Sequence, residues 1–220
     1  AGRNYHSMTT PVIVVGCGGH SKVLIDALQT NSVRVLGITD IRTESHGSFL
    51  LGVPVIGDDR QIFKYAPDTV CLVNGIGSTS STSLRRLVFE KFKSAGYRFA
   101  TVVHSNAVVS QHTQLDEGVQ IMAGAVIQAG ACIGINAIVN TRSSVDHDCI
   151  IGAHVHVAPG ATLSGGVVIE DGVHIGTGST VIQGICIGKE STVGAGAVVI
   201  SHVNSNRKVV GIPAKELRDD

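Results

Sequence analysis

An aliphatic residue recurs at every sixth position over much of this 220-residue chain. From Val103 to Val199, seventeen successive positions spaced six residues apart are all Val, Ile or Leu. A period of six fits neither the turn of an α-helix nor the simple alternation of a half-buried strand. It predicts a repeat architecture in which short strands turn corners and stack on one another.

The other positions of the hexad support this interpretation. Four residues after most of the aliphatic positions the side chain is small or β-branched, as at Ala125, Ala161 and Ser191. Three residues after them, the common types are Gly, Asn and Asp: Asn106, Gly118, Gly124, Gly130, Asn136, Asp148, Gly160, Gly166, Gly172, Gly178, Gly184 and Gly196. These residue types adopt a positive φ at low cost. Each hexad therefore predicts a short strand with an inward aliphatic side chain, followed by a tight turn.

The composition restricts the class of protein. The formal net charge is zero and no basic stripe is present, which argues against a nucleic-acid partner. No apolar stretch reaches the length that spans a membrane, so we expect no membrane insertion. The five cysteines lack metal-ligand or redox spacing, and we therefore expect a reducing, cytoplasmic location. Residues 1–7 are left out of the predicted fold.

The first hundred residues follow a different pattern. Apolar strands are predicted at Pro11–Gly16, Val33–Asp40 and Val70–Val73. Helices are predicted at Ser21–Gln29 and at Ser81–Ala95, the second with Leu84, Leu87, Val88 and Phe92 on its apolar side. Strands joined through helices form a parallel sheet, so we predict a small Rossmann-like α/β domain over residues 8–100. The β-helix and a C-terminal tail then occupy residues 101–220.

The glycine turn Gly16–Gly19 has two interpretations. Its N–H groups and the helix N-terminus behind them could face a phosphate, with Asp40 accepting from a ribose hydroxyl. Alternatively, the turn is only a tight connection and Asp40 ends a strand. The third glycine of a dinucleotide fingerprint is replaced by Ser21, so nicotinamide redox chemistry is not expected.

The order of these features resembles one enzyme family. A G-C-G-G-H-S-K-V turn, an α/β segment and an uninterrupted hexapeptide repeat are similar to the nucleotide-sugar acetyltransferases of the sialic-acid O-acetyltransferase-like group. The run N-T-R-S-S-V-D-H-D-C-I-I-G (Asn140–Gly152) and the tail G-I-P-A-K (Gly211–Lys215) carry the resemblance further. The subgroup most similar in sequence pattern acetylates UDP-linked 4-amino sugars in bacterial glycan biosynthesis. The resemblance implies a left-handed parallel β-helix in which residue i stacks on residue i+18.

The resemblance also implies the reaction and its residues. His147 corresponds to the general base that takes a proton from the sugar amine, and Asp148 would orient its ring. Acetyl-CoA would be the acetyl donor, with no metal required and with direct transfer to the amine. The nucleotide sugar would be bound by Gly18, Gly19, His20, Asp40, Gly75, Gly77 and Asn140. Acetyl-CoA would be bound by His156, Gly165, Thr177 and Ala195. A homotrimer is expected, with each active site shared between neighbouring subunits.

Several alternatives remain open from the sequence. The acceptor could be a GDP- or dTDP-linked amino sugar, or the enzyme could O-acetylate sialic acid. His147, His154, His156 and His174 could instead bind zinc, as in carbonic anhydrases of the γ type that use the same helix. The chain could also be a solenoid that binds nucleotide sugars without catalysis.

Overall fold

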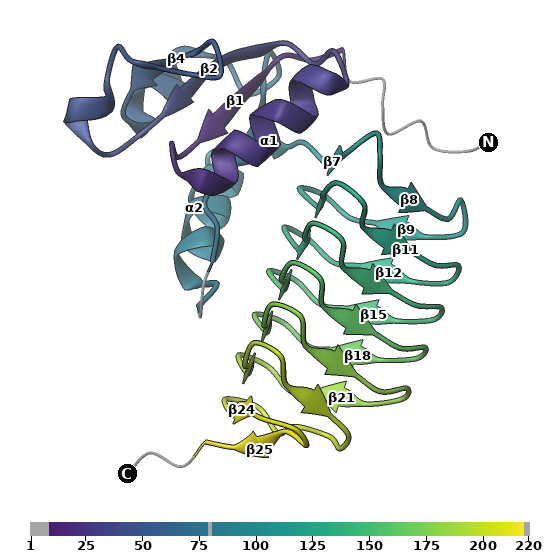
Figure 1. The fold of residues 1–220 in the computed structure, drawn as a ribbon. Helices are drawn as coiled ribbons and strands as arrows, with labels where there is room; N and C mark the ends of the chain where they lie inside the picture. Colours follow the sequence, from purple (N-terminus) through teal and green to yellow (C-terminus); the bar gives the residue numbers. More distant parts are fainter. Residues whose placement is uncertain (1–8, 79–80, 218–220) are drawn as a thin grey trace.

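The computed structural model describes residues 9–78 and 81–217, and these form two parts. Figure 1 shows an α/β domain made by the first hundred residues, seated beside the first coils of a long stack of short strands. The expectation for residues 1–7 lies outside the described residues. No helix in the described part of the chain has both the length and the apolar character needed to cross a bilayer.

The α/β domain is built on one six-stranded sheet. Its strand order is β3-β4-β2-β1-β5-β6, and every pairing is parallel except that between β3 and β4. The strands are β1 (Val12–Val15), β2 (Val35–Thr39), β3 (Phe49–Leu50), β4 (Val53–Gly57), β5 (Cys71–Asn74) and β6 (Arg98–Phe99). The sequence prediction contained β1, β2 and β5 but not the β3–β4 hairpin. Two 3₁₀ helices, η1 (Thr43–Ser45) and η2 (Asp59–Lys64), flank that hairpin.

Both faces of the central strand are covered. Val12 and Val14 pack with α1 (Gly19–Thr30), whereas Ile13 and Val15 pack with α2 (Ser83–Ser94). All four side chains are fully buried, as expected of a parallel strand between two helical layers. The carboxyl ends of β1 and β5 therefore meet at one edge of the sheet, next to the start of α1.

The apolar side predicted for α2 was partly wrong. Leu84 and Leu87 are 60% and 61% exposed, while Arg85, Phe89 and Phe92 are buried. The two aromatic rings fill the space against the sheet, and Phe89 also lies 4.5 Å from Phe99, measured between ring centroids. Because these large rings set the rotation of the helix, the leucines turn outward and a cation turns inward.

The remaining chain forms a triangular left-handed β-helix with three faces. Face 1 holds β7 (Val102–Val103), β10 (Gln120–Ile121), β13 (Ile138–Val139), β16 (His156–Val157), β19 (His174–Ile175), β22 (Thr192–Val193), β24 (Lys208–Val210) and β25 (Lys215–Glu216). Face 2 holds β8 (Val108–Val109), β11 (Val126–Ile127), β14 (Ser144–Val145), β17 (Thr162–Leu163), β20 (Thr180–Val181) and β23 (Val198–Val199). Face 3 holds β9 (Gln114–Leu115), β12 (Cys132–Ile133), β15 (Ile150–Ile151), β18 (Val168–Ile169) and β21 (Cys186–Ile187). The strand pairings within these faces are parallel except that between β24 and β25. Val139 pairs with Val157 and Val157 with Ile175, which confirms the predicted register of eighteen residues.

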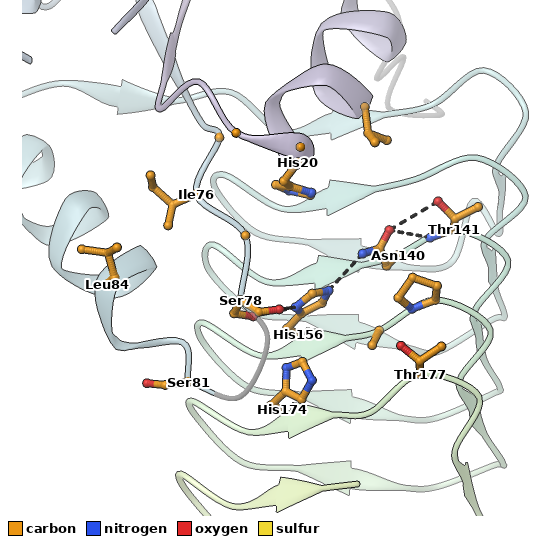
Figure 2. A pocket seen from close by; sticks show the side chains of 17 residues that line it. His20, Ile76, Ser78, Ser81, Leu84, Asn140, Thr141, His156, His174 and Thr177 are labelled. Carbon is orange, nitrogen blue, oxygen red and sulfur yellow. Dashed lines mark hydrogen bonds between the residues drawn. The ribbon is translucent and has the colours of Figure 1, made fainter. Parts of the chain in front are cut away.

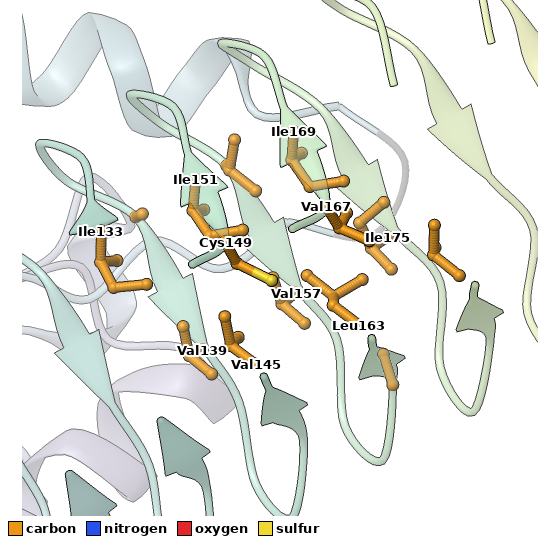
Figure 3. Close-up of a cluster of buried hydrophobic side chains, with 14 of the residues drawn as sticks. Ile133, Val139, Val145, Cys149, Ile151, Val157, Leu163, Val167, Ile169 and Ile175 are labelled. Carbon is orange, nitrogen blue, oxygen red and sulfur yellow. The ribbon is translucent and has the colours of Figure 1, made fainter. Parts of the chain in front are cut away.

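The hexad aliphatics form the core of this prism, as predicted. Sixteen of the seventeen are buried, and Val109 near the first coil is half-buried. Figure 3 shows their side chains meeting in the narrow interior, with Cys149 among them. Burial of one such side chain contributes roughly 1.5–3 kcal/mol before ordering entropy is subtracted. The small corner residues Ala125, Ala161 and Ser191 are also buried.

The corners impose a left-handed backbone conformation even where the sequence does not favour it. Asn136 and Asp148 have positive φ angles, as predicted, but so do Arg142, His154 and Glu190 at equivalent positions. Asn106, in the first coil, is not among the positive-φ residues, so the prediction was wrong there. The stacking of neighbouring coils therefore decides the corner geometry, rather than the local preference of each residue.

Candidate active site

A cleft of about 890 Å³ lies between the α/β domain and face 1 of the β-helix. Figure 2 shows its walls: the start of α1 and the segment after β5 on one side, and His156, His174 and Asn140 of the coils on the other. Eight of the residues predicted to bind ligands line it: Gly18, Gly19, His20, Gly75, Gly77, Asn140, His156 and Thr177. Residues far apart in the sequence thus converge here.

The glycine turn and the loop after β5 are held together by Ser21. Its hydroxyl donates to the carbonyl oxygens of Gly16 at 2.6 Å and Gly75 at 3.1 Å. Ser21 occupies the place of the missing third glycine, so the departure from the dinucleotide fingerprint has a structural reason. Gly16 has a φ of 97° and is tightly enclosed by Ile76, which leaves no room for a side chain.

His20 is neutral and has a defined tautomer. Gln120 donates its amide N–H to the carbonyl of Asn74 at 2.9 Å, which turns its Oε1 toward His20 Nε2 at 2.8 Å. Nε2 of His20 therefore carries the proton, and Nδ1 keeps its lone pair. Burial, reinforced by the nearby Arg85 cation, lowers the pKa of His20 to about 4. This side chain can accept a hydrogen bond from a ligand but carries no charge at neutral pH.

His156 is fixed by protein partners on both ring nitrogens. The backbone N–H of Thr141 donates to Oδ1 of Asn140 at 2.8 Å, so Asn140 Nδ2 points to His156 Nε2 at 3.0 Å. His156 Nδ1 faces Ser78, 2.6 Å from its hydroxyl and 3.1 Å from its carbonyl oxygen. Burial lowers the pKa of His156 to about 3, with His174 adding to the effect. The ring therefore joins the loop after β5 to the coils and offers no free nitrogen to a ligand.

His174 lies one coil further and is less constrained. Its ring stands edge-on to that of His156, with 5.1 Å between centroids, and only 6% of the residue is exposed. Nδ1 has no hydrogen-bond partner within residues 9–78 and 81–217, and burial lowers the pKa of the ring. From the sequence, His174 was a candidate only for the alternative zinc site, although its place one coil beyond His156 was the available signal for a role in the cleft.

Asp40 does not line the cleft. It follows β2 at the same sheet edge, but both carboxylate oxygens accept from Arg42, the shortest contact being 2.7 Å. Although burial opposes ionisation, these hydrogen bonds keep the pKa of Asp40 below its usual value. The guanidinium of Arg42 also donates to the carbonyl of Cys17, next to the glycine turn. A ribose would reach this carboxylate only if Arg42 moved.

The predicted base lies at another corner of the prism. His147 and Asp148 stand where face 2 turns into face 3, whereas Asn140 and Thr177 stand where face 1 turns into face 2. His147 is 64% exposed at its side chain, and its Nδ1 lies 2.9 Å from Asp148 Oδ2. The hydrogen bond to Asp148 and the charge of Asp146 raise the pKa of His147. Within one chain, His147 therefore lies at a different corner from the cleft.

Of the four residues predicted for acetyl-CoA, His156 lies on face 1 in the cleft, and the other three divide between the same two corners. Thr177 and Ala195 are exposed and lie in one column, because they are eighteen residues apart. Gly165 instead lies under the ring of His147: a Cβ atom there would stand 2.5 Å from its Cε1 and Nε2. The N–H of Gly165 has no partner in the described part of the chain. A donor and a base are thus adjacent at the second corner.

The four histidines proposed as a zinc site do not form one ligand set. His154 bonds to Asn136 at the corner between faces 3 and 1, and His147 bonds to Asp148 at the corner between faces 2 and 3. Only His156 and His174 are neighbours. Among the residues that the structure describes, no group of three or more His, Cys, Asp or Glu side chains could hold a metal ion.

The sequence and the fold have known counterparts. The profile of the family described as PglD N-terminal domain matches residues 11–92. GDP-perosamine N-acetyltransferase of Escherichia coli O157:H7 is 37% identical over 92 residues, which is 42% of this chain and 42% of that protein. The match to this curated relative thus spans less than half of its length.

Two solved structures match almost completely. PerB from Caulobacter crescentus, in complex with CoA and GDP-perosamine, has a TM-score of 0.88 and 36% identity. The match covers 96% of this chain and 99% of PerB. The acetyltransferase domain of PglB from Neisseria gonorrhoeae, in complex with acetyl coenzyme A, has a TM-score of 0.89 and 34% identity, covering 96% of this chain and 100% of that one.

Proposed function

Because this chain belongs to the family of hexapeptide-repeat nucleotide-sugar N-acetyltransferases that carry a PglD N-terminal domain, we propose that it acetylates a GDP-linked amino sugar. Membership makes it an acetyl-CoA-dependent acyltransferase whose acceptor is a nucleotide-linked amino sugar. The UDP-linked acceptor expected from the sequence is not confirmed. Support for a GDP-linked acceptor comes from the similarity to GDP-perosamine N-acetyltransferase of Escherichia coli and to PerB, whose solved structure contains GDP-perosamine.

The observation that carries the proposal is the cleft itself. It joins a glycine turn and a helix N-terminus, which suit a diphosphate, to a polar wall on the coils that includes Asn140. Three neutral histidines (His20, His156 and His174) line it and add no positive charge that would repel an incoming sugar ammonium group. The cleft thus accommodates the two chemically different ends of one acceptor.

We infer that His147 removes the proton from the acceptor amine. The carboxylate of Asp148 accepts a hydrogen bond from Nδ1–H, so Nε2 keeps the lone pair that a base requires. The amine nitrogen then forms a bond to the thioester carbonyl carbon, and the carbon–sulfur bond breaks. An entering ammonium group carries one proton more than the amide and the thiol need: one proton leaves to solvent, and the other passes from the nitrogen through Nε2 to the leaving thiolate. The free N–H of Gly165 lies beside this ring and suits the oxyanion that develops on the carbonyl oxygen.

The separation of base and cleft supports a shared active site. In a homotrimer the corner that bears His147 on one subunit would face the cleft and the column of Thr177 and Ala195 on its neighbour. Head-to-tail contacts of this kind close into a ring under threefold symmetry. This arrangement supplies each cleft with a base that its own chain holds at a different corner.

A panel of activated sugars tests the proposed reaction. GDP-, UDP- and dTDP-linked 4-amino sugars, their 4-hydroxy counterparts and sialic acid are each incubated with acetyl-CoA. Release of CoA thiol and the mass of the product are measured. We expect turnover with the GDP-linked amine and none with the hydroxy sugars. Preferred turnover of the UDP-linked amine would correct the nucleobase, and acetylation of sialic acid would replace the proposal.

A further inference from the structure

Arg85 is a buried cation whose role the catalytic scheme leaves unexplained. Only 1% of it is exposed, and none of the ion pairs in the described part of the chain includes it. A buried charge that lacks an opposite charge destabilises a fold unless dipoles compensate it. Here backbone carbonyl groups compensate the charge of the guanidinium, and these groups belong to a segment that lines the cleft.

The guanidinium joins the loop after β5 to the β-helix. Its Nη1 donates to the carbonyl oxygens of Asn74 at 2.8 Å and Ile76 at 2.9 Å, and its Nε donates to that of Asn136 at 3.1 Å. In the opposite direction, Asn74 Nδ2 donates to the backbone carbonyl of Arg85 and to Asn136 Oδ1. The peptide groups that follow Asn74 and Ile76 are thus bound through their carbonyl oxygens on the side facing Arg85. On this side α2 packs against the corner between faces 3 and 1.

The geometry of the peptide group between Ile76 and Gly77 fixes the direction of its N–H bond once its carbonyl oxygen is held. In a planar trans peptide the C=O and N–H bonds point in opposite directions. The carbonyl of Ile76 points to Arg85, so the N–H of Gly77 points away from it. Gly77 is exposed and lines the cleft, whereas Arg85 does not. Within the described residues this N–H has no partner, whereas that of Gly75 is used by the carbonyl of Val15.

The free N–H lies beside the N-terminus of α1. A Cβ atom on Gly77 would be 3.3 Å from Cβ of His20, which is in the first turn of that helix. Two sets of backbone donors therefore converge on the same part of the cleft, and such an arrangement favours an anion.

We propose that Arg85 is a positioning residue for the acceptor: by fixing the Ile76 carbonyl, it aims the Gly77 N–H at a diphosphate oxygen of the nucleotide sugar. The proposal rests on the proposed function, because the anion belongs to that substrate. The guanidinium does not touch the ligand. After burial, the positive charge of Arg85 is one of the further causes that lower the pKa values of His20 and His156.

Binding of each ligand to paired variants tests this role. Calorimetry measures the affinity for GDP, for UDP and for acetyl-CoA, each alone, in the full-length protein. Arg85→Met should weaken the nucleotide by about tenfold or more, the usual effect of losing a hydrogen bond to a charged group, and leave acetyl-CoA within about twofold. Arg86→Met is the matched control. Arg86 is the next residue of α2 and pairs with Glu190, so it also joins the helix to the coils but does not touch the loop.

A second pair tests the donor itself and keeps the proposal falsifiable if Arg85→Met fails to fold. Gly77→Pro removes the N–H, whereas Gly77→Ala adds a side-chain carbon but keeps the N–H. Proline should reproduce the selective loss of nucleotide affinity, and alanine should lose less. Equal binding by Gly77→Pro and Gly77→Ala, or an equal loss of nucleotide and acetyl-CoA in Arg85→Met, would overturn the inference. Failure of the wild-type protein to bind any nucleotide would instead reject the proposed function.

Discussion

Replacement of Gly165 by alanine should displace the imidazole of His147, the proposed base, without disturbing the fold. The new Cβ would stand 2.5 Å from Cε1 and Nε2 of His147. Non-bonded carbon atoms rest about 3.5–4.0 Å apart, so the ring must move by about 1 Å or more. Gly165 does not have a left-handed φ, and alanine therefore adopts its backbone conformation without strain. Misplacement by about 1 Å costs on the order of 10²-fold in rate, and we expect kcat to fall by that factor.

Initial rates of CoA thiol release, at saturating acetyl-CoA and acceptor, measure the effect, and thermal unfolding checks the fold. Gly166→Asn is the matched control: a side chain there meets open space, and Asn tolerates the φ of 67° at that position. It should keep near wild-type kcat. The double variant Gly165→Ala/His147→Ala should be about as slow as His147→Ala alone, because both changes act on one group.

Two results would refute this reasoning. Wild-type kcat in folded Gly165→Ala would mean that the position of the ring is unimportant. A double variant much slower than His147→Ala would mean that the methyl group acts on acetyl-CoA rather than on the base.

Other predictions address the base, the assembly, acid stability and metal. Asp148→Asn removes the main cause of the raised pKa of His147, so the acid limb of the kcat/KM profile should move to lower pH and the rate should fall. An unmoved limb would exclude His147 as the titrating base. Subunits with His147→Ala, co-assembled one to one with Asn140→Ala subunits, should regain about a quarter of wild-type activity, because half the clefts and half the bases are intact in a shared site. No recovery, or an active monomer by light scattering, would exclude the sharing. The pKa values of His20 and His156, about 4 and about 3, lie below the ordinary value of about 6.5. Below pH 6.5 these histidines bind protons in the unfolded chain but not in the native protein. The free energy of unfolding measured in urea should therefore decline toward pH 4, and it should decline less steeply in His156→Gln. Dialysis against a strong chelator should leave activity unchanged, whereas a loss restored by zinc would reopen the metal site.

The sequence predicted the β-helix well because its signal is local and repeated. Each hexad aliphatic points inward, whereas the left hand and the eighteen-residue register came from the resemblance to a known family. Less of the α/β domain could be predicted, because the rotation of α2 is decided by Phe89 and Phe92 packing against distant strands. Nothing in the local sequence distinguishes Leu84, which is exposed, from Phe89, which is buried.

The candidate site was predictable where motifs supply ligand-facing groups and less so where tertiary contacts decide. The glycine turn and Asn140 line the cleft as expected, but Asp40 is engaged by Arg42, a pairing that depends on the conformation of one loop. Both nitrogens of His156 are occupied, one of them by Ser78, which no motif marked. Arg85 escaped notice because a single cation on a helix ordinarily faces solvent.

The column of residues at the corner between faces 1 and 2, exposed except for the half-buried Thr141, has a geometric consequence. Thr141, Pro159, Thr177 and Ala195 repeat at intervals of one coil, and each coil rises about 4.8 Å, so the column extends roughly 14 Å along the axis. A linear ligand laid along it meets an equivalent backbone environment at each step. Insertion or deletion of a whole coil would keep the register of every remaining strand. The number of coils would then set the length of the linear ligand that can bind along the column, independently of the chemistry at the cleft.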